Sequence, residues 1–300
     1  MSVKVNSNLI GNYVFPVNER IFNNIKNVET SGMRGLCSRD FLGRNVSDSF
    51  IFHFKYETDI DFTILYVAKK YLDDKYPSIK KSLYMYYVPY ARMDRETETE
   101  ICTIKYICQM INDLNFSSVL VVDPHSNVTP ALLNHCEVIY PFAMHENIIL
   151  NNKIDYILFP DLGASKKYSS LHKYSVPFIN GHKVRKTDST NNQIIEYDIL
   201  SAPSNLDNTS VLIIDDICSA GTTFLNAGKI LKDKYNVNDV YLFTTFTENN
   251  IYNGEMINSK YIDKIYTTNF IGNHNYINKK DEEYDSCQDI NNKKIIVLDF

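Results

Sequence analysis

Short apolar runs alternate with amphipathic stretches along this chain, and the alternation limits the fold more than any other feature. Apolar runs of strand length occupy residues 50–54, 83–88, 119–122, 156–159, 211–214 and 240–245. Apolar residues at helical spacing lie between them, at 62–76, 103–114, 164–173 and 222–234. Strands alternating with helices predict βαβ units, and continuous apolar strands predict parallel sheets covered on both faces. The expected class is α/β.

The length of 300 residues favours two domains, and an Asn-rich stretch after Pro141 marks the expected boundary. We expect domains at 1–145 and 146–300, each with a mostly parallel sheet flanked by helices. Residues 180–210 are polar and predict a long mobile loop with a short hairpin. Residues 273–292 are expected to be peripheral, and residues 294–298 to return as a strand.

Composition excludes several classes of protein. The net charge is −5, which argues against nonspecific nucleic-acid binding. No apolar run reaches the roughly 18 residues of a membrane span, so no membrane partner is expected. The six cysteines form no CxxC pair, and the first residues do not read as a secretory leader. These features predict a cytoplasmic protein with reduced thiols.

The most informative motif is an apolar strand followed by two acids and a small, hydroxyl-bearing turn that opens a helix. Its polar and small residues are Asp215, Asp216, Ser219, Ala220, Gly221, Thr222 and Thr223. Free N–H groups and the helix dipole make such a turn an anion site. Two acids beside it suit a sugar phosphate, because acids bind ribose hydroxyls while the turn binds the 5-phosphate. The alternative is an ordinary helix cap after an acidic turn.

This motif resembles the diphosphoribosyl-binding loop of the phosphoribosyltransferase fold family. Further motifs across residues 80–270 look more specifically like ribose-phosphate pyrophosphokinase (PRPP synthetase). The resemblance implies two tandem phosphoribosyltransferase-like domains. It also implies Mg²⁺-dependent transfer of diphosphate from ATP to the C1 hydroxyl of ribose 5-phosphate, giving PRPP and AMP. Members of the family assemble as homodimers that often build homohexamers.

Two motifs in the first half resemble the family's ATP-binding elements. Residues 88–95 are similar to its PYxxYARQDR loop, which implies ATP contacts by Arg92, Asp94 and Arg95, with Met93 where the family usually has Gln. An Arg fork suits bidentate phosphate binding. Residues 122–126 resemble the DxH segment, which implies that His125 lies beside Mg²⁺ or an ATP phosphate. Alternatively, the arginines pair with nearby glutamates on a solvated surface.

Two motifs in the second half complete the resemblance. Residues 159–164 are similar to the SPDxGG turn, which implies that Asp161 reaches a metal ion or the sugar hydroxyls. Residues 182–186 resemble the flexible catalytic loop, in which Lys183 and Arg185 would neutralise the transferring phosphoryl group. Taken alone, the first motif is a turn signal and the second a solvated basic surface.

Three alternatives to the PRPP-forming reaction remain. Residues 266–269, 123–126 and 103–105 look more like phage-encoded members associated with NAD⁺ salvage, so ADP-ribose is a second candidate acceptor, giving ADP-ribose pyrophosphate. A phosphoribosyltransferase that consumes PRPP would share the Ser-Ala-Gly-Thr turn. A non-catalytic regulatory homologue would keep the fold, but such proteins typically lose the loop cations or the acids.

Overall fold

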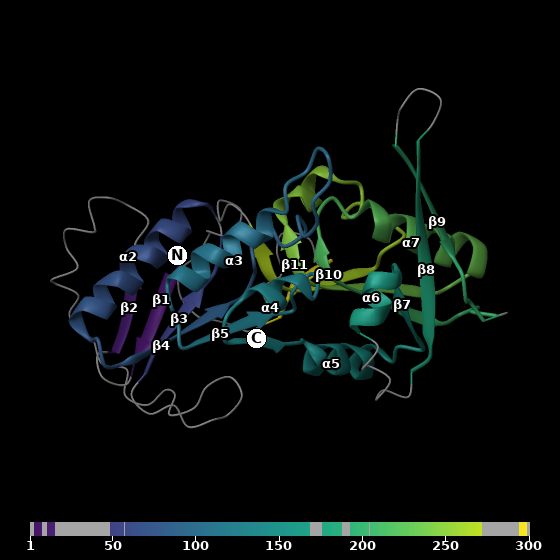
Figure 1. Cartoon of the computed structure of the whole chain (residues 1–300). Coiled ribbons are helices and arrows are strands. Elements are labelled where there is room, and N and C mark those ends of the chain that lie inside the picture. The colour runs from purple at the N-terminus through teal and green to yellow at the C-terminus, as the bar shows by residue number, and fades with distance from the viewer. Residues whose placement is uncertain are drawn as a thin grey trace. The chain divides into compact units, whose positions relative to one another are not determined.

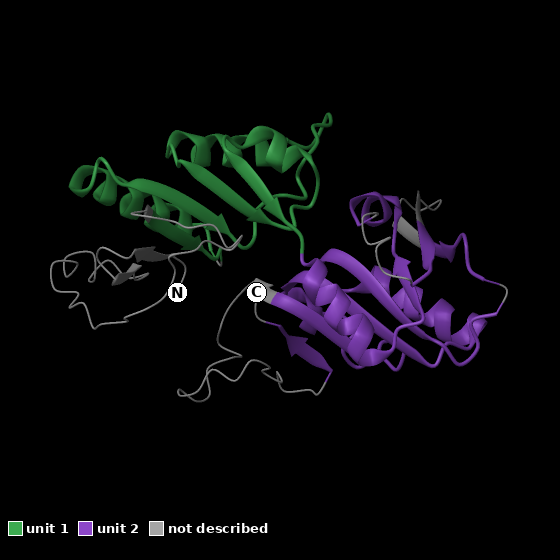
Figure 2. Ribbon diagram, turned by 90° about the horizontal axis from the view of Figure 1, so that it is seen from below, with its two compact units in different colours: residues 1–140 green, residues 141–300 purple. Residues whose placement is uncertain are grey.

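The computed structural model describes residues 3–7, 11–15, 49–56, 58–168, 176–187, 193–203, 205–271 and 294–298. The chain divides into two compact units, residues 1–140 and 141–300 (Figure 2). The second unit opens with helix α5 (Phe142–Asn152), so the boundary expected after residue 145 falls inside a helix. None of the helices in the described ranges combines the length and the apolar character that crossing a membrane requires.

The first unit is built on a six-stranded sheet with the order β2-β1-β3-β4-β5-β6 (Figure 1). Its strands are β1 (Val3–Ser7), β2 (Gly11–Phe15), β3 (Ser49–Phe54), β4 (Lys80–Met85), β5 (Ser118–Val122) and β6 (Cys136–Ile139). Strands β3 to β6 are parallel, and β1 pairs antiparallel with both neighbours. The helices are α2 (Ile60–Lys75), α3 (Thr103–Asp113) and α4 (Val128–Leu132). Apolar residues of α2 and α3 pack with the central strands in one buried core.

The second unit holds a seven-stranded sheet with the order β13-β12-β11-β10-β7-β8-β9. Its strands are β7 (Tyr156–Phe159), β8 (Phe178–Thr187), β9 (Gln193–Ile199), β10 (Ser210–Cys218), β11 (Asp239–Glu248), β12 (Lys264–Ile271) and β13 (Ile295–Val297). All of them pair in parallel except β9, which is antiparallel to β8. Helices α6 (Leu162–Lys167) and α7 (Thr222–Tyr235) and the short 3₁₀ helix η3 (Asn249–Asn253) complete the unit.

Strand β10 shows how the sequence positions the two acids. Val211 and Ile213 belong to the core that also contains the buried face of α7. Side chains alternate between the two faces of a strand, so Leu212 points to the other face. Continuing this alternation puts Asp215 on the α7 face and Asp216 on the opposite one. Two adjacent acids thus enter different surroundings.

The α/β class with mostly parallel sheets flanked by helices is confirmed, and β13 confirms the expected strand at 294–298. Three local predictions are wrong. Within 180–210, the segments Gly181–Thr187 and Gln193–Ile199 form the antiparallel β8–β9 hairpin, which is longer than the short hairpin expected, while 188–192 and 204 lie outside the described residues. The helix expected at 164–173 begins at Leu162 and ends at Lys167, with 169–173 outside the described residues. The strand expected to stop at residue 214 continues through both acids to Cys218. Residues 273–292 lie outside the described residues.

Candidate functional site

Asp215 and Asp216 lie at the carboxyl end of β10, the edge of a parallel sheet where α/β proteins bind ligands. Asp215 pairs with Thr244 of β11. The Asp216 backbone N–H donates to Asp215 Oδ1 over 2.9 Å. Asp216 is buried, and Lys167 Nζ on α6 lies 3.8 Å from its Oδ1. The protein therefore places a cation of its own beside Asp216.

Asp215 has the opposite electrostatic surroundings. Burial raises its pKa well above the ordinary carboxyl range, and the negative charges of Asp216 and Asp161 raise the pKa further. The backbone hydrogen bond from Asp216 only partly opposes this shift. A group that donates hydrogen bonds, or a metal ion, would relieve this repulsion. Clustered acids with a raised pKa are typical of a functional site.

The turn after β10 has the geometry of an anion site. Gly221 precedes α7 with φ of +80°, a conformation that favours glycine, and as a glycine it brings no capping side chain to the first turn of the helix. The N–H groups of that turn, which includes Thr222 and Thr223, have no partner within the helix. The dipole of this 14-residue helix adds positive potential at the same place.

A neighbouring segment holds the turn in shape. Asn250 Nδ2 of η3 donates to Ser219 Oγ over 3.1 Å. Gly254 approaches so closely that a Cβ there would lie 2.2 Å from the carbonyl oxygen of Ala220. Only glycine permits this contact between two backbone segments. The predicted turn, Ser219 to Thr223, is therefore assembled before any ligand arrives.

Asp161 caps helix α6 as well as lying near the acids. Its Oδ1 accepts from the Ala164 N–H over 2.9 Å. Within the described ranges, no three His, Cys, Asp or Glu side chains gather as a metal-binding group. Mg²⁺ held by one or two carboxylates, substrate phosphates and water needs no such group, and carboxylate oxygens are its preferred ligands. The residues at this edge thus fit Mg²⁺ bound together with a phosphate ligand.

The predicted ATP-contacting residues lie in the first unit. Arg92 and Arg95 are exposed in the segment between β4 and α3, and Asp94 and His125 are partly exposed. In this described segment, neither arginine forms a salt bridge with the nearby glutamates. The alternative of a paired surface therefore loses its support. His125 and Asp161, the predicted metal neighbours, belong to different units.

The base of this arginine segment is held by Tyr90. Its backbone has φ of +61°, which is unusual for a bulky side chain. The Tyr90 hydroxyl donates to Asp59 Oδ1 over 2.8 Å, and the Tyr56 hydroxyl donates to the same oxygen over 2.7 Å. At the other end, the Ile104 N–H donates to the Met93 carbonyl over 3.3 Å. The exposed arginines thus project from an anchored backbone.

Lys183 and Arg185 lie on strand β8, and their backbones pair with Tyr197 and Ile195 of β9. Their side chains fall outside the described part. The structure therefore brings together Asp161, Asp215, Asp216 and the turn before α7, and places the backbone of Lys183 on an adjoining hairpin.

Three residues of this region escaped sequence reasoning: Lys167, Tyr197 and Asn250. Lys167 follows the Pro-Asp-x-Gly turn by one short helix, so its spacing offered a weak signal. Asn250 of η3 contacts Ser219, and the Tyr197 hydroxyl of β9 comes close to Gly181 on the neighbouring strand β8. No local sequence pattern reveals either contact.

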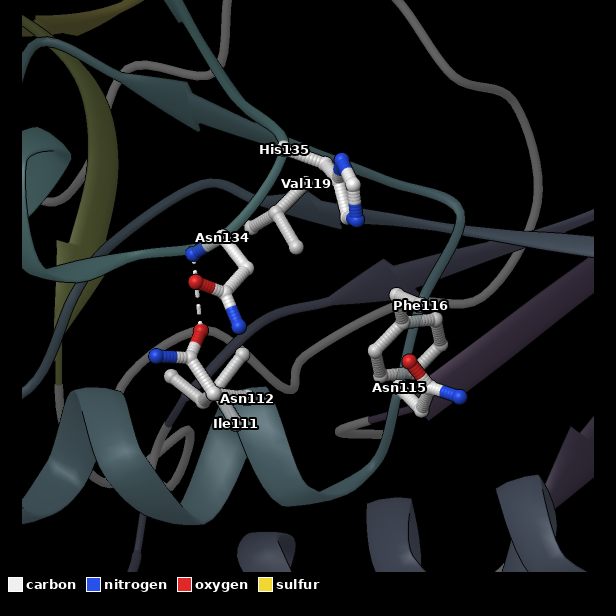
Figure 3. Close-up of a pocket in the computed structure, with 7 residues that line it drawn as sticks. All are labelled: Ile111, Asn112, Asn115, Phe116, Val119, Asn134 and His135. Atoms are coloured by element: carbon white, nitrogen blue, oxygen red, sulfur yellow. Dashed lines mark hydrogen bonds between the residues drawn. The ribbon is translucent and has the colours of Figure 1, made fainter.

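A small cavity in the first unit lies at the amino ends of its strands, whereas α/β proteins bind ligands at the carboxyl ends. It is lined by residues at the end of α3 and the starts of β5 and β6, including Asn112, Val119 and His135 (Figure 3). The Asn134 N–H donates to Asn112 Oδ1 there over 2.8 Å. The space of about 10 Å³ suits at most a water molecule.

Parts of this chain are similar to known proteins. Residues 150–274 match the family model of the phosphoribosyl transferase domain. A ribose-phosphate pyrophosphokinase of Saccharolobus solfataricus is 29% identical over 152 residues, which are 48% of this chain and 50% of that protein. The match thus spans about half the length of this curated relative. The phosphoribosylpyrophosphate synthetase of Mycobacterium smegmatis aligns with a TM-score of 0.56 at 14% identity, over 73% of this chain and 76% of that one. That likeness shows a shared fold.

Proposed function

We propose that this protein is a ribose-phosphate diphosphokinase, which transfers diphosphate from ATP to the C1 hydroxyl of a ribose 5-phosphate moiety. The observation that carries the proposal is the joint presence, at the carboxyl end of β10, of an acid pair and a braced turn that opens helix α7. Acids that accept from sugar hydroxyls and a turn that binds a phosphate match the two ends of ribose 5-phosphate.

In this proposal Asp215 and Asp216 bind the ribose hydroxyls, and the turn from Ser219 to Thr223 binds the 5-phosphate. The C1 oxygen attacks the β-phosphorus of ATP and forms the new O–P bond. The bond from the β-phosphorus to the oxygen that bridges it to the α-phosphorus breaks, AMP leaves with that oxygen, and the proton of the C1 hydroxyl passes to water. Mg²⁺, held by the phosphates and by carboxylates that include Asp161, would neutralise charge on the transferring group.

We assign ATP binding to residues of the first unit, and stabilisation of the transition state to the β8–β9 hairpin. Arg92, Asp94, Arg95 and His125 would bind ATP. Lys183 and Arg185 would stabilise the charge on the transferring group, because phosphoryl transfer depends mainly on positioning and electrostatics. Exposed arginines on an anchored backbone support the first assignment. The family's use of ATP and Mg²⁺, and its dimeric or hexameric assembly, come to this chain only as part of the proposal.

The test is a product assay with the full chain, ATP and Mg²⁺. Ribose 5-phosphate and ADP-ribose are offered separately, and products are identified by mass. We expect stoichiometric AMP and a sugar product that has gained diphosphate. A product from ADP-ribose alone would move the proposal to that acceptor. Consumption of PRPP with a nucleobase, without ATP, would replace it with a phosphoribosyltransferase, and no turnover with any combination would favour a regulatory homologue.

A further inference from the structure

The hydroxyl of Tyr197 is buried beside the acid site and has no hydrogen-bond partner among the described residues. Its ring packs against the core under α7, so the side chain is fixed by packing. A buried hydroxyl without a partner costs free energy. A bound ligand that forms a hydrogen bond with this hydroxyl would remove the cost, and the neighbouring residues indicate which ligand group could do so.

Strand register places this hydroxyl at the acid site. Phe159 of β7 pairs with Asn180 of β8, and Leu158 pairs with Ile213 of β10. Pro160 directly follows β7. Extending the same register places it beside Gly181 of β8 on one side and beside Asp215 of β10 on the other. The three strands lie side by side, and β9 lies next to β8 (Figure 1). The edge of the sheet thus brings Gly181, Pro160 and Asp215 into one row.

Gly181 makes room for the hydroxyl in this row. A Cβ on Gly181 would lie 1.9 Å from Tyr197 Oη and 2.9 Å from the carbonyl oxygen of Pro160. The hydroxyl therefore occupies the space that any other residue would fill, directly beside the backbone that leads into Asp161. Consistently, burial raises the pKa of Tyr197, and the negative charges of Asp161 and Asp215 raise it further.

The chemistry of the neighbours selects the ligand group. Carboxylates accept hydrogen bonds, whereas a phenol hydroxyl can donate one. A sugar hydroxyl does both, so it can donate to an acid and accept from Tyr197 at once. We infer that Tyr197 is a substrate-positioning residue whose hydroxyl donates to a ribose hydroxyl that is bound by Asp215 or Asp161. This inference rests on the proposed function and adds a sugar contact from β9.

The inference also concerns the hairpin. Tyr197 pairs with Lys183 across the β8–β9 ladder. A sugar held by Tyr197 would therefore fix the strand position opposite Lys183. The same residue would link sugar binding to the placement of the hairpin that carries the proposed transition-state cations.

The experiment compares wild type with Tyr197→Phe, which removes a single oxygen and keeps the packing. Calorimetry measures the affinity for ribose 5-phosphate with Mg²⁺ and, separately, for inorganic phosphate. We expect Tyr197→Phe to weaken ribose 5-phosphate binding about tenfold, as the loss of a good hydrogen bond predicts. Phosphate binding should not change, and the melting temperature without ligand should be equal or higher. Tyr235→Phe, at the far end of α7 against the same core, is the matched control.

The outcomes distinguish a failure of the proposed function from a failure of the Tyr197 contact. If wild type does not bind ribose 5-phosphate, the proposed function fails and the inference fails with it. If wild type binds and Tyr197→Phe binds equally well, only the role of Tyr197 is overturned. Deoxy sugars give a second check, since the penalty of Tyr197→Phe should vanish for either 2-deoxy- or 3-deoxyribose 5-phosphate. A penalty that persists with both would also overturn the contact.

Discussion

Lys167 Nζ lies 3.8 Å from Asp216 Oδ1, and the two side chains are only 10% and 7% exposed. This pairing makes the two adjacent acids unequal. Asp216 has a cation of the protein beside it, whereas Asp215 faces further negative charge. Lys167 therefore already offsets the negative charge of Asp216. The negative charge of Asp215 is left to be offset by a bound ligand or metal ion.

Replacing Lys167 should destabilise the protein, because Asp216 loses its neighbouring charge in a poorly solvated place. We expect Lys167→Met to lower the free energy of unfolding by on the order of 2 kcal/mol, measured by urea denaturation. The adjacent, exposed Lys166→Met is the control and should stay within about 0.5 kcal/mol of wild type. Adding Asp216→Asn to Lys167→Met should restore most of the loss. An unchanged midpoint in Lys167→Met would show that the pair contributes nothing.

Asp215 is expected to lower stability in the absence of ligand. Its folded pKa lies above the ordinary value of 3.8, so the folded state holds the proton more tightly than the unfolded state. Stability is then lost as pH rises from about 4 through the folded pKa. Asp215→Asn should therefore melt higher than wild type at pH 7.5, with a gain that shrinks toward pH 4. Thermal scans across this range measure it, and the exposed Asp233→Asn should show no such gain.

His145 is expected to make the protein sensitive to acid. It is fully buried against Tyr168 and Phe243, and neither ring nitrogen has a hydrogen-bond partner among the described residues. Burial lowers its pKa from 6.5 to about 3. Below pH 6.5 the His145 side chain binds a proton in the unfolded state but not in the folded state. Stability should therefore fall by about 1.4 kcal/mol per pH unit down to about pH 3.

His145→Leu should remove this slope. The difference in the free energy of unfolding between His145→Leu and wild type, measured by urea denaturation at each pH, should shift in favour of the variant by about 2 kcal/mol between pH 7 and pH 5. The exposed His135→Asn is the control, because asparagine tolerates the positive φ of that position. Parallel pH profiles for wild type and His145→Leu would contradict the assignment.

Gly254 should be essential for the shape of the turn from Ser219 to Thr223, which we propose binds phosphate. Gly254→Ala puts a Cβ against the Ala220 carbonyl oxygen, and backbone cannot yield as a flexible side chain can. We expect ribose 5-phosphate affinity, measured by calorimetry, to fall by at least about tenfold, because the turn must shift. Gly163→Ala is milder, since its Cβ would lie 3.1 Å from a carboxylate oxygen. Equal affinities in Gly254→Ala and wild type would remove the argument for a fixed turn.

Lys183 should matter for turnover and little for sugar binding. If it stabilises the transferring group, Lys183→Ala should lower kcat by about a thousandfold and change ribose 5-phosphate affinity by about twofold or less. Rapid-quench measurement of AMP release gives the first quantity and calorimetry the second. Lys186→Ala, on the same strand, is the control. Undiminished turnover in Lys183→Ala would remove the hairpin from the chemistry.

The fold class and the acid-containing motif were predictable from the sequence because both depend on local patterns. Apolar runs that alternate with helical spacing predict βαβ units, and the order of residues 211–223 predicts a strand, a turn and a helix. The boundaries were less accurate. Strand β10 continues through the acids because Asp215, Ile217 and Cys218 keep pairing with β11, an interaction that the polarity of the two acids conceals.

The hairpin and the contacts around the acids were not predictable for the same kind of reason. The range 180–210 is polar, yet antiparallel pairing of β8 with β9 gives regular structure to residues 181–187 and 193–199. The proximity of Lys167 to Asp216, and the space that Gly181 leaves for Tyr197, arise between segments that the sheet brings together. Such contacts follow from register, and register is set only when the whole sheet is assembled.

The β8–β9 hairpin has a mechanical consequence. In the described ladder β8 pairs with β7 only through residues 178–180, whereas its pairing with β9 continues from Gly181 to Thr187. Beyond Asn180 the two strands form a ribbon that is tied to the sheet at one end and packs on the core under α7 through Tyr197. A rotation of this ribbon would break no pair with β7, would shift Tyr197 against that core, and would carry the backbones of Lys183 and Arg185 together. If Lys183 and Arg185 contact the transferring group as proposed, their two charges would reach it in a fixed order and spacing, because both belong to one strand.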